Sequence, residues 1–414
     1  MTDPELPLLT EPARPVGPVV TTAEQLAETA ELLRADAALP IGIDTERAHG
    51  YRYFSRAYLI QLRTANGPAR LVDPIAFNDT ELEPLREVLN RREWILHAAS
   101  QDLPCLLERD LRPTRVWDTE MGGRLLGLPR VGMASLAEVY GGVRLKKEHS
   151  AADWSRRPLP DSWLAYAALD VELLHTFLAQ EADALTSAGK AEWWAQECQY
   201  ELDVAVPPRQ LPGPDDWRRT SGMHQLRKPR QLAAVRELWL ARDAIARKLD
   251  RSPSKILPDR AISAAAEHLS LTGLAAYENR GAKRWRTNWE AALAKARDLS
   301  TSQLPPVHVP NPGPPHHRNW ERRAPRAAHR LEVAKAALTE LSEQIEVPQE
   351  NILAPDLLRQ LMWKPPEDLA VGLAQLNARP WQIELTTELL ASAVLAGERS
   401  GLPEVVRSRR GRSS

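Results

Sequence analysis

Short apolar runs alternate with longer runs of helical leucine spacing between residues 20 and 205. The runs PIGIDTE, AYLIQLRTA, ARLVDP and EWILHA are bounded by turn or charged residues, which is typical of strands. The segments LEPLREVLNRR, QDLPCLLERDL and SWLAYAALDVELLHTFLAQEADAL have leucines at helical spacing. Because the two element types alternate, the pattern predicts an α/β domain built on a sheet.

The second half of the chain has almost no strand pattern and is predicted to be all helical, with LAAVRELWLARDAIARKLD and LEVAKAALTELSEQI as its most periodic segments. Prolines concentrate at 207–217 and 304–317, and such stretches form semi-rigid linkers because proline fixes φ and lacks a backbone donor. We therefore predict an N-terminal extension at 1–19, an α/β domain at 20–205, helical domains at 215–300 and 326–400, a linker at 301–325 and a disordered basic tail at 401–414.

The two helical domains share a motif. In each, a long amphipathic helix leads to a proline and then to Ile-Leu, as RSPSKILPD at 251–259 and EVPQENILAPD at 346–356. The two copies lie about 96 residues apart, which we interpret as an internal repeat of one helical domain type. The alternative explanation is that a proline in the turn between two helices is common in helical proteins.

Charge is distributed unevenly along the chain. Residues 217–300 contain 18 Lys and Arg against 8 Asp and Glu, although the whole chain has a net charge of −1. Such a segment presents a surface that attracts phosphates. The arginines of VVRSRRGRSS at the C-terminus extend this basic character.

Other bulk features exclude several classes of protein. Cys105 and Cys198 are the only cysteines and lack zinc-finger spacing, so neither a disulfide framework nor a structural zinc is indicated. The N-terminus lacks the pattern of a signal peptide, and no apolar run approaches the roughly 18 residues that span a bilayer. We therefore expect a cytoplasmic protein that has no membrane partner.

Two carboxylates project from one predicted strand. In IGIDTE, Ile41 and Ile43 fall on one face, and Asp44 and Glu46 fall on the other. Like charges side by side on a buried strand are unfavourable unless a cation lies between them, which indicates a metal site. A strand end that reaches solvent at Asp44 is the alternative.

Two further segments offer acidic groups. Asp102 follows the strand-like WILH in the predicted first turn of a helix capped by Ser100, where it could equally serve the helix dipole. Tyr166 and Asp170 share one helical face at i,i+4 spacing, and a phenol beside a metal-bound water can orient that water or accept its proton. An aromatic residue that covers apolar surface, next to an aspartate at the helix edge, would give the same pattern.

These motifs together resemble those of the DEDDy 3′–5′ exonucleases, and of ribonuclease D among them. The resemblance covers most of residues 35–180 and rests on Asp44-Thr45-Glu46, on His97-Ala98 followed by Asp102, and on Tyr166 with Asp170, reinforced by AYLIQL and DWSRRPLP. It implies a ribonuclease H-like mixed sheet flanked by helices and two divalent ions, Mg²⁺ or Mn²⁺. It also implies that Asp44, Glu46 and Asp170 hold one ion, that Asp44 and, through water, Asp102 hold the other, and that Tyr166 positions the attacking water.

One position departs from the family pattern. Family members commonly carry an aromatic or apolar residue after Asp-Thr-Glu, whereas this chain has Arg47. Because no metal-ligand position is missing, we expect altered substrate contacts rather than lost activity.

The helical segments resemble HRDC domains, through RELWLARDAIARKLDRSPSKILPD and NRGAKRW in the first and more divergently in the second. Tryptophans interleave with the basic residues of the first and either stack on bases or form its core: Trp217, Trp239, Trp285 and Trp289. The candidate nucleic-acid-binding residues of the basic segment are Arg218, Arg219, Lys228, Arg230, Arg247, Lys248, Lys255, Lys283, Arg284 and Arg286.

The fold class expected overall is an α/β ribonuclease H-like domain followed by two all-α HRDC-type domains. The function expected is a metal-dependent 3′–5′ exoribonuclease that releases nucleoside 5′-monophosphates from RNA 3′ ends, with transfer-RNA precursors as the substrate that the family implies. A DNA-directed exonuclease of the same chemistry and a catalytically silent nucleic-acid-binding scaffold remain as alternatives. A contact to a 2′-hydroxyl would distinguish RNA from DNA.

Overall fold

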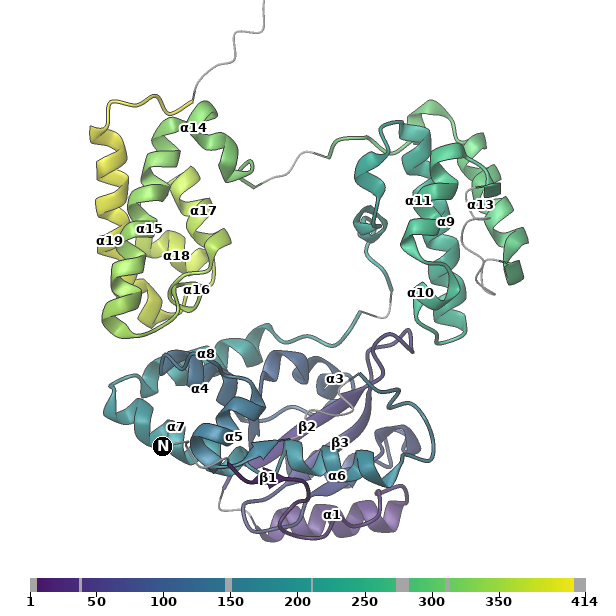
Figure 1. The fold of residues 1–414 in the computed structure, drawn as a ribbon, viewed down its shortest axis with the longest axis vertical. Coiled ribbons are helices and arrows are strands. Elements are labelled where there is room, and N and C mark those ends of the chain that lie inside the picture. Colours follow the sequence, from purple (N-terminus) through teal and green to yellow (C-terminus); the bar gives the residue numbers. More distant parts are fainter. Residues whose placement is uncertain are drawn as a thin grey trace, which may run out of the picture.

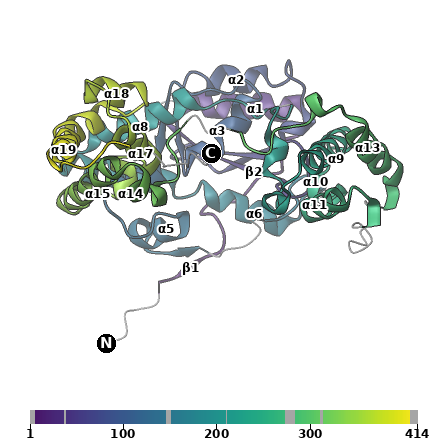
Figure 2. The same cartoon turned by 90° about the horizontal axis from the view of Figure 1, so that it is seen from above.

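The computed structural model of this chain describes residues 6–36, 39–145, 151–209, 211–272, 283–309 and 313–405. It contains an α/β domain and two helical bundles, which stand at opposite ends of that domain (Figures 1 and 2). We call residues 216–303 the first bundle and residues 317–399 the second bundle. The arginines of the predicted basic tail lie outside the described residues, as does most of NRGAKRW.

A mixed sheet forms the centre of the α/β domain. In the spatial order β4-β3-β2-β5-β6, its strands are β4 (Arg70–Val72), β3 (Ala57–Arg63), β2 (Ile41–Arg47), β5 (Glu93–Leu96) and β6 (Arg115–Asp118). β2 runs antiparallel to β3 and parallel to β5, and β5 runs parallel to β6. Strands β2 to β5 match the four predicted segments, whereas the sequence gives little sign of β6 because its four residues include only two apolar side chains.

Side chains alternate across the sheet and bury both of its faces. Ile43 and Ile60 join one apolar core with α1 (Ala23–Ala35) and α2 (Glu83–Leu89). Leu59 and Ile95 lie on the opposite face, where α6 (Asp161–Asp170) and α7 (Leu174–Ser187) pack. Because both faces are covered, β2 and β3 are almost continuously buried rather than buried at alternate positions.

The long helix predicted over residues 162–185 is two helices, α6 and α7. The chain leaves the helical path at 171–173, where Glu172 pairs with Arg63 and accepts a hydrogen bond from the backbone N–H of Ala13. The leucine spacing continues across this break and conceals it. The break leaves Asp170 at the C-terminal end of α6.

The remaining elements of the α/β domain surround the sheet. They are α3 (Leu103–Leu107), α4 (Thr119–Leu125), α5 (Met133–Gly141) and α8 (Ala191–Val204). A short strand in the N-terminal extension, β1 (Leu8–Leu9), pairs in parallel with β7 (Arg144–Leu145). The extension is therefore tied to the domain by backbone hydrogen bonds.

The two bundles repeat one succession of helices. The first bundle contains α9 (Pro229–Lys248), α10 (Pro253–Ile256), α11 (Asp259–His268) and α13 (Arg286–Asp298). The second contains α14 (Trp320–Arg323), α15 (Pro325–Ile345), α16 (Gln349–Ile352), α17 (Pro355–Trp363), α18 (Leu369–Gln375) and α19 (Pro380–Arg399). In each, a long helix is followed by a short helix that begins near a proline and then by a further helix.

Backbone angles at equivalent positions support the predicted repeat. Asp250 and Glu346, which follow α9 and α15, both have positive φ, at 44° and 51°. Leu257 (φ −153°, ψ 115°) and Leu353 (φ −154°, ψ 116°) follow the short helices in the same extended conformation. The assignment of the second bundle to the HRDC type stays a prediction.

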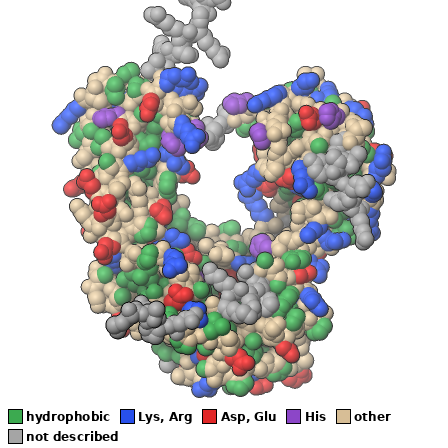
Figure 3. Space-filling view, viewed as in Figure 1, with side chains coloured by type: hydrophobic (Ala, Val, Ile, Leu, Met, Phe, Trp, Pro, Cys, Tyr) green, Lys and Arg blue, Asp and Glu red, His purple; other side chains and the backbone are tan. Residues whose placement is uncertain are grey.

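Each bundle contacts the α/β domain directly. The loop between β2 and β3 contacts the first bundle, and α8 contacts α19 of the second bundle. In the space-filling view an opening remains between the bundles above the α/β domain (Figure 3). None of the helices in the described ranges is long and apolar enough to cross a membrane.

Candidate active site

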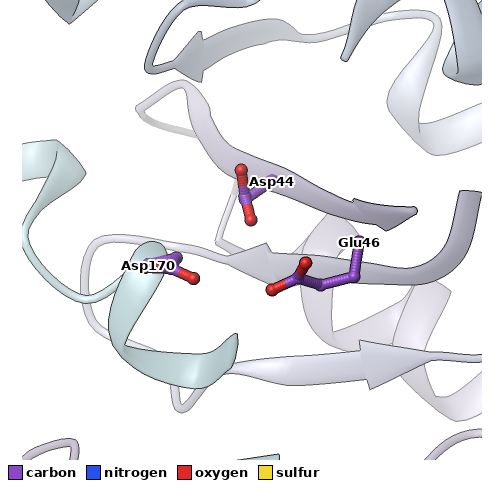
Figure 4. A group of neighbouring side chains, drawn as sticks. All are labelled: Asp44, Glu46 and Asp170. Atoms are coloured by element: carbon purple, nitrogen blue, oxygen red, sulfur yellow. The ribbon is translucent and has the colours of Figure 1, made fainter. Parts of the chain in front are cut away.

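Two carboxylates of the site come from the middle of the sheet. Asp44 and Glu46 lie on the face of β2 that is covered by α6 and α7, since a Cβ at Gly42 on the same face would meet Leu174 of α7. One oxygen of each, together with one oxygen of Asp170, lie within 4.8 Å of one another. Figure 4 shows the three side chains pointing into a shared space between β2 and the end of α6. The alternative of a strand end at Asp44 does not hold, because β2 continues past the half-buried Asp44 to Arg47.

Helix α6 contributes Asp170 and Tyr166, one turn apart. Their side chains are hydrogen-bonded to each other, with the phenol donating to the carboxylate. Tyr166 packs on Trp154, whose ring is fully buried and lies 6.5 Å away between centroids. The DWSRRPLP segment that contains Trp154 is anchored to the sheet by a 2.6 Å ion pair between Arg157 and Asp73. This segment therefore holds the aromatic side of the site in place.

Asp102 lies next to this cluster, beside the opposite face of β2. Its Oδ1 accepts hydrogen bonds from the Thr45 hydroxyl at 2.5 Å and from Arg47 Nη1 at 3.2 Å. Asp102 is the N-cap residue of α3, yet its carboxylate makes no capping hydrogen bond. Helix capping therefore does not explain why an aspartate is buried at this position.

The turn before Asp102 differs from the prediction. Ser100 does not cap α3, because the chain first forms a 3₁₀ turn at Ala99–Gln101 that begins from Ala98 with φ 59°. The Asp118 carboxylate stabilises this turn by accepting the N–H groups of Ala98 at 3.0 Å and Ala99 at 2.7 Å. Asp118 at the end of β6 thus positions Asp102, and the sequence analysis missed it together with its strand.

A second positioning residue also went unnoticed in the sequence. Gln61 faces Asp44 across β2 and β3 and donates from Nε2 to Asp44 Oδ2 at 3.2 Å, while its side chain is fully buried. The available signal was an amide in the middle of the apolar strand AYLIQL. A buried polar group in such a strand needs a partner, and here that partner is a site carboxylate.

Burial and mutual repulsion make the site electrostatically unfavourable without a cation. Burial, then the charges of Asp102, Asp170 and Glu46, raise the pKa of Asp44 well above its usual value. Burial and the neighbouring carboxylates also raise the pKa of Glu46 to about 9 and that of Asp170 to about 7. Burial raises the pKa of Asp102 to about 6. Protons therefore take the place of positive charge in the metal-free cluster.

The donor set fits hard divalent cations. The three converging groups offer only carboxylate oxygens, the ligands that Mg²⁺ and Mn²⁺ prefer, and no nitrogen or sulfur ligand joins them among the described residues. A divalent ion bound here would offset the repulsion that raises the pKa values. The carboxylates of the site can therefore hold such an ion.

The predicted nucleic-acid-binding residues fall into two groups. Eight are exposed on the first bundle: Arg219, Lys228, Arg247, Lys248, Lys255, Lys283, Arg284 and Arg286. Arg230 instead donates to the carbonyls of Ala296, Arg297 and Leu299 at the end of α13, and Arg218 pairs with Asp215. Trp217 and Trp289 are buried in the bundle core, so they cannot stack on bases, whereas Trp239 and Trp285 are half-buried.

Comparisons with known proteins place the three parts of the chain. A family model described as 3′–5′ exonuclease matches residues 18–181, a model of the HRDC domain matches 231–301, and a model of a 3′ to 5′ exonuclease C-terminal domain matches 313–394. The ribonuclease D of Pseudomonas paraeruginosa is 31% identical over 288 residues, which cover 66% of this chain and 73% of that protein.

Two solved structures resemble the whole chain. A protein from Bifidobacterium adolescentis has a TM-score of 0.84 at 31% identity, covering 94% of this chain and all of that one. Ribonuclease D of Escherichia coli, described as an exoribonuclease involved in structured RNA processing, has a TM-score of 0.68 at 26% identity, covering 92% of this chain and 99% of that one.

The mixed sheet and its converging carboxylates define a 3′–5′ exonuclease of a metal-dependent class, linked to an HRDC domain. Within that class the chain belongs to the ribonuclease D family. The family expected from Asp44-Thr45-Glu46, His97-Ala98 and Tyr166-x-x-x-Asp170 is confirmed. We refer below to the α/β domain as the exonuclease domain.

Proposed function

We propose that this 3′–5′ exoribonuclease removes nucleoside 5′-monophosphates from the 3′ ends of structured RNA, with transfer-RNA precursors as substrates. The observation that carries the proposal is the convergence of Asp44, Glu46 and Asp170 within 4.8 Å, with Tyr166 hydrogen-bonded to Asp170. The RNA preference rests on the ribonuclease D relatives and on the exposed basic residues of the first bundle.

The residues would divide the work as follows. Asp44, Glu46 and Asp170 would hold one divalent ion, and Asp44 with Asp102, acting through water, would hold a second. Two such ions supply an activated water and neutralise charge on the attacked phosphate and on the departing 3′-oxygen. Gln61 fixes the orientation of Asp44, and Thr45 fixes that of Asp102.

Tyr166 is suited to orienting the attacking water. Burial, then the charges of Asp170, Glu46 and Asp44, raise the pKa of its phenol well above the usual value. In the metal-free site the phenol is therefore a neutral hydrogen-bond donor. A neutral phenol that donates hydrogen bonds is suited to holding a water in place, which is the first of the two roles that the sequence left open.

The decisive experiment compares wild type with Asp44→Ala and Asp170→Ala on a 3′-extended transfer RNA and on DNA of matched sequence, with Mn²⁺ or Mg²⁺ titrated. We expect stepwise release of mononucleotides from the RNA by wild type only, with RNA binding retained in both variants. Activity of either variant at the wild-type level would refute the mechanism. Faster digestion of the DNA would favour the DNA-directed alternative, and inactive wild type would favour a binding scaffold.

Metal binding should depend on pH in a defined direction. In the metal-free protein Glu46 and Asp170, with pKa values of about 9 and about 7, are protonated at pH 6. An incoming ion must displace these protons, so affinity for Mn²⁺ should rise from pH 6 to pH 9. Calorimetry in buffers of different ionisation enthalpy measures the proton release directly. Affinity that is constant over this range would contradict the protonated cluster.

The raised pKa values of these carboxyl groups also affect the stability of the fold. A carboxyl whose pKa is higher in the folded than in the unfolded protein stabilises the fold at low pH, and this contribution is lost as the pH rises from the unfolded toward the folded pKa. The metal-free protein should therefore lose stability between about pH 4.5 and 9, and Mn²⁺ should restore it. Thermal unfolding with and without a chelator tests this.

A further inference from the structure

Arg47 is a permanent positive charge built into the acidic cluster. Its Nη1 donates to Asp102 Oδ1 at 3.2 Å and also to the carbonyl of Gln101. The side chain is 18 % exposed and the Asp102 side chain 4 %, so solvent screens this pair weakly. The guanidinium thus lies where a family member with an aromatic or apolar residue would have no charge.

The strand geometry explains why an arginine here reaches Asp102. Thr45 and Arg47 are two positions apart on β2, so their side chains leave on the same face, opposite to Asp44 and Glu46. The pairing of β2 with β3 shifts register between Glu46 and Arg47, at the end of the strand. Both residues bond to the same oxygen of Asp102, which leaves the other oxygen, Oδ2, without either contact.

The charge of Arg47 acts on three of the four carboxylates of the site. It opposes the effect of burial on the pKa of Asp44, of Glu46 and of Asp102. The guanidinium carries a full positive charge. Its field therefore repels any divalent cation that approaches these carboxylates, and most strongly one that approaches Asp102, which it contacts.

We propose that Arg47 is a positioning residue that orients Asp102 and weakens the binding of the second divalent ion until a substrate phosphate is present. This inference rests on the proposed two-ion function. Without RNA, Asp44, Glu46 and Asp170 bind one ion, while Arg47 occupies Asp102 and opposes the second. A phosphate group adds the negative charge that offsets the guanidinium, so the second ion and the phosphate bind cooperatively.

A direct count of bound Mn²⁺ tests the inference without relying on activity. The loss of the electron paramagnetic resonance signal of free Mn²⁺ is measured with the full-length chain in the absence of RNA. We expect wild type to bind one ion tightly and a second weakly. Arg47→Gln should bind the second ion at least about ten-fold more tightly, whereas Arg47→Lys, which keeps the charge, should resemble wild type.

Adenosine 5′-monophosphate serves as the phosphate probe. It should strengthen the binding of the second ion in wild type. The effect should be much smaller in Arg47→Gln, because the variant no longer has the charge that the phosphate offsets. The matched control is Arg242→Gln, which removes another largely buried arginine from an ion pair, with Asp259, in the first bundle and outside the cluster. The control should bind Mn²⁺ like wild type.

The outcomes separate this inference from the proposed function. A merely structural role for Arg47 predicts weaker metal binding in the glutamine variant, so weaker or unchanged binding of the second ion overturns the inference alone. Equal binding by wild type and Asp44→Ala, or no binding at all, would overturn the metal site itself and the inference with it. Arg47→Met provides a second neutral variant in case the glutamine variant does not fold.

Discussion

The two helical bundles share one succession of helices but are joined to the exonuclease domain in different ways. In both, the corner after the long helix makes the contact, at Asp250 in the first bundle and at Glu346 in the second. Asp250 uses its carboxylate, which accepts the N–H groups of Tyr53 and Phe54 at 3.1 and 3.2 Å. Glu346 uses its backbone, which lies so close to Gly127 that a Cβ there would be 2.5 Å from the carbonyl oxygen.

The interfaces also differ in chemistry. The apolar core of the second bundle is continuous with that of the exonuclease domain, and Trp381 stacks on Trp193 of α8 at 4.8 Å. The first bundle has a separate core and is attached mainly through the polar loop that follows β2.

The two bundles also differ in charge. Residues 217–300 contain 18 Lys and Arg against 8 Asp and Glu, whereas residues 326–398 contain 6 against 11. The second bundle thus shares a core with the exonuclease domain, while the first bundle keeps a basic surface close to the loop that follows β2.

The largest effect should come from Trp381→Ala. Trp381 is 1 % exposed and donates from Nε1 to Glu197 of α8 at 2.7 Å, where Arg379 also pairs with Glu197 at 2.7 Å. Truncating a buried tryptophan costs about 3–5 kcal/mol, and here it also removes a partner of a buried carboxylate. Because the core is shared, the second bundle and the exonuclease domain should lose stability together, as measured by urea unfolding.

Trp289→Ala is the matched truncation in the first bundle. Trp289 is fully buried, but in the separate core of that bundle. Its loss should shift a transition of the first bundle and leave that of the exonuclease domain in place. A single transition that shifts equally in both variants would contradict the difference between the bundles.

This shared core could not be predicted from the sequence. The amphipathic patterns of α9 and α15 are alike, and a pattern gives the apolar face of a helix without its partner. The proline-rich linkers predict separate blocks, and they give no sign that the second bundle packs on the exonuclease domain around Trp193 and Glu197.

The candidate site was more accessible to prediction. Strand alternation placed Asp44 and Glu46 on one face, and helical spacing placed Tyr166 beside Asp170, because both rules depend only on local geometry. The position of Asp102 depends on a turn held by Asp118 from a strand that the sequence barely reveals. The contact of Arg47 with Asp102 likewise depends on the tertiary structure, so the sequence pattern of β2 cannot predict it.

A smaller effect is expected from Asp250→Asn. The substitution keeps a residue that tolerates positive φ but removes the charge from a group that accepts two backbone hydrogen bonds, which are worth about 1–3 kcal/mol together with the Tyr58 hydroxyl bond. We expect faster amide exchange at Tyr53 and Phe54 and a several-fold higher KM for structured RNA.

Glu346→Gln tests the equivalent corner of the second bundle. Its closest contact with Gly127 is made by a backbone oxygen, and glutamine keeps the Cβ that also lies near this glycine. The change removes only the charge near Lys190, so it should alter stability by less than about 0.5 kcal/mol. Equal effects of the two substitutions on amide exchange or on KM would show that the corners dock in the same way after all.

The smallest effect concerns the basic surface. Three basic residues are exposed near Asp250, close to the loop that follows β2: Arg247, Lys248 and Lys255. Each contact between such a side chain and a phosphate of single-stranded RNA contributes about 0.7 to the slope of log affinity against log salt. Replacing all three by glutamine should therefore reduce that slope by up to about 2, while the rate of cleavage at saturating RNA changes little.

The matched triple variant replaces Arg322, Arg323 and Lys335, which are exposed on the second bundle. Because the surroundings of these residues carry more acidic than basic groups, phosphates should not approach them closely, and the salt slope should stay at the wild-type value. Filter binding of the same 3′-extended transfer RNA over a range of salt concentrations measures both variants. Equal slope changes in the two would mean that RNA contacts both bundles alike, and the division of roles inferred from their interfaces would then not extend to their surfaces.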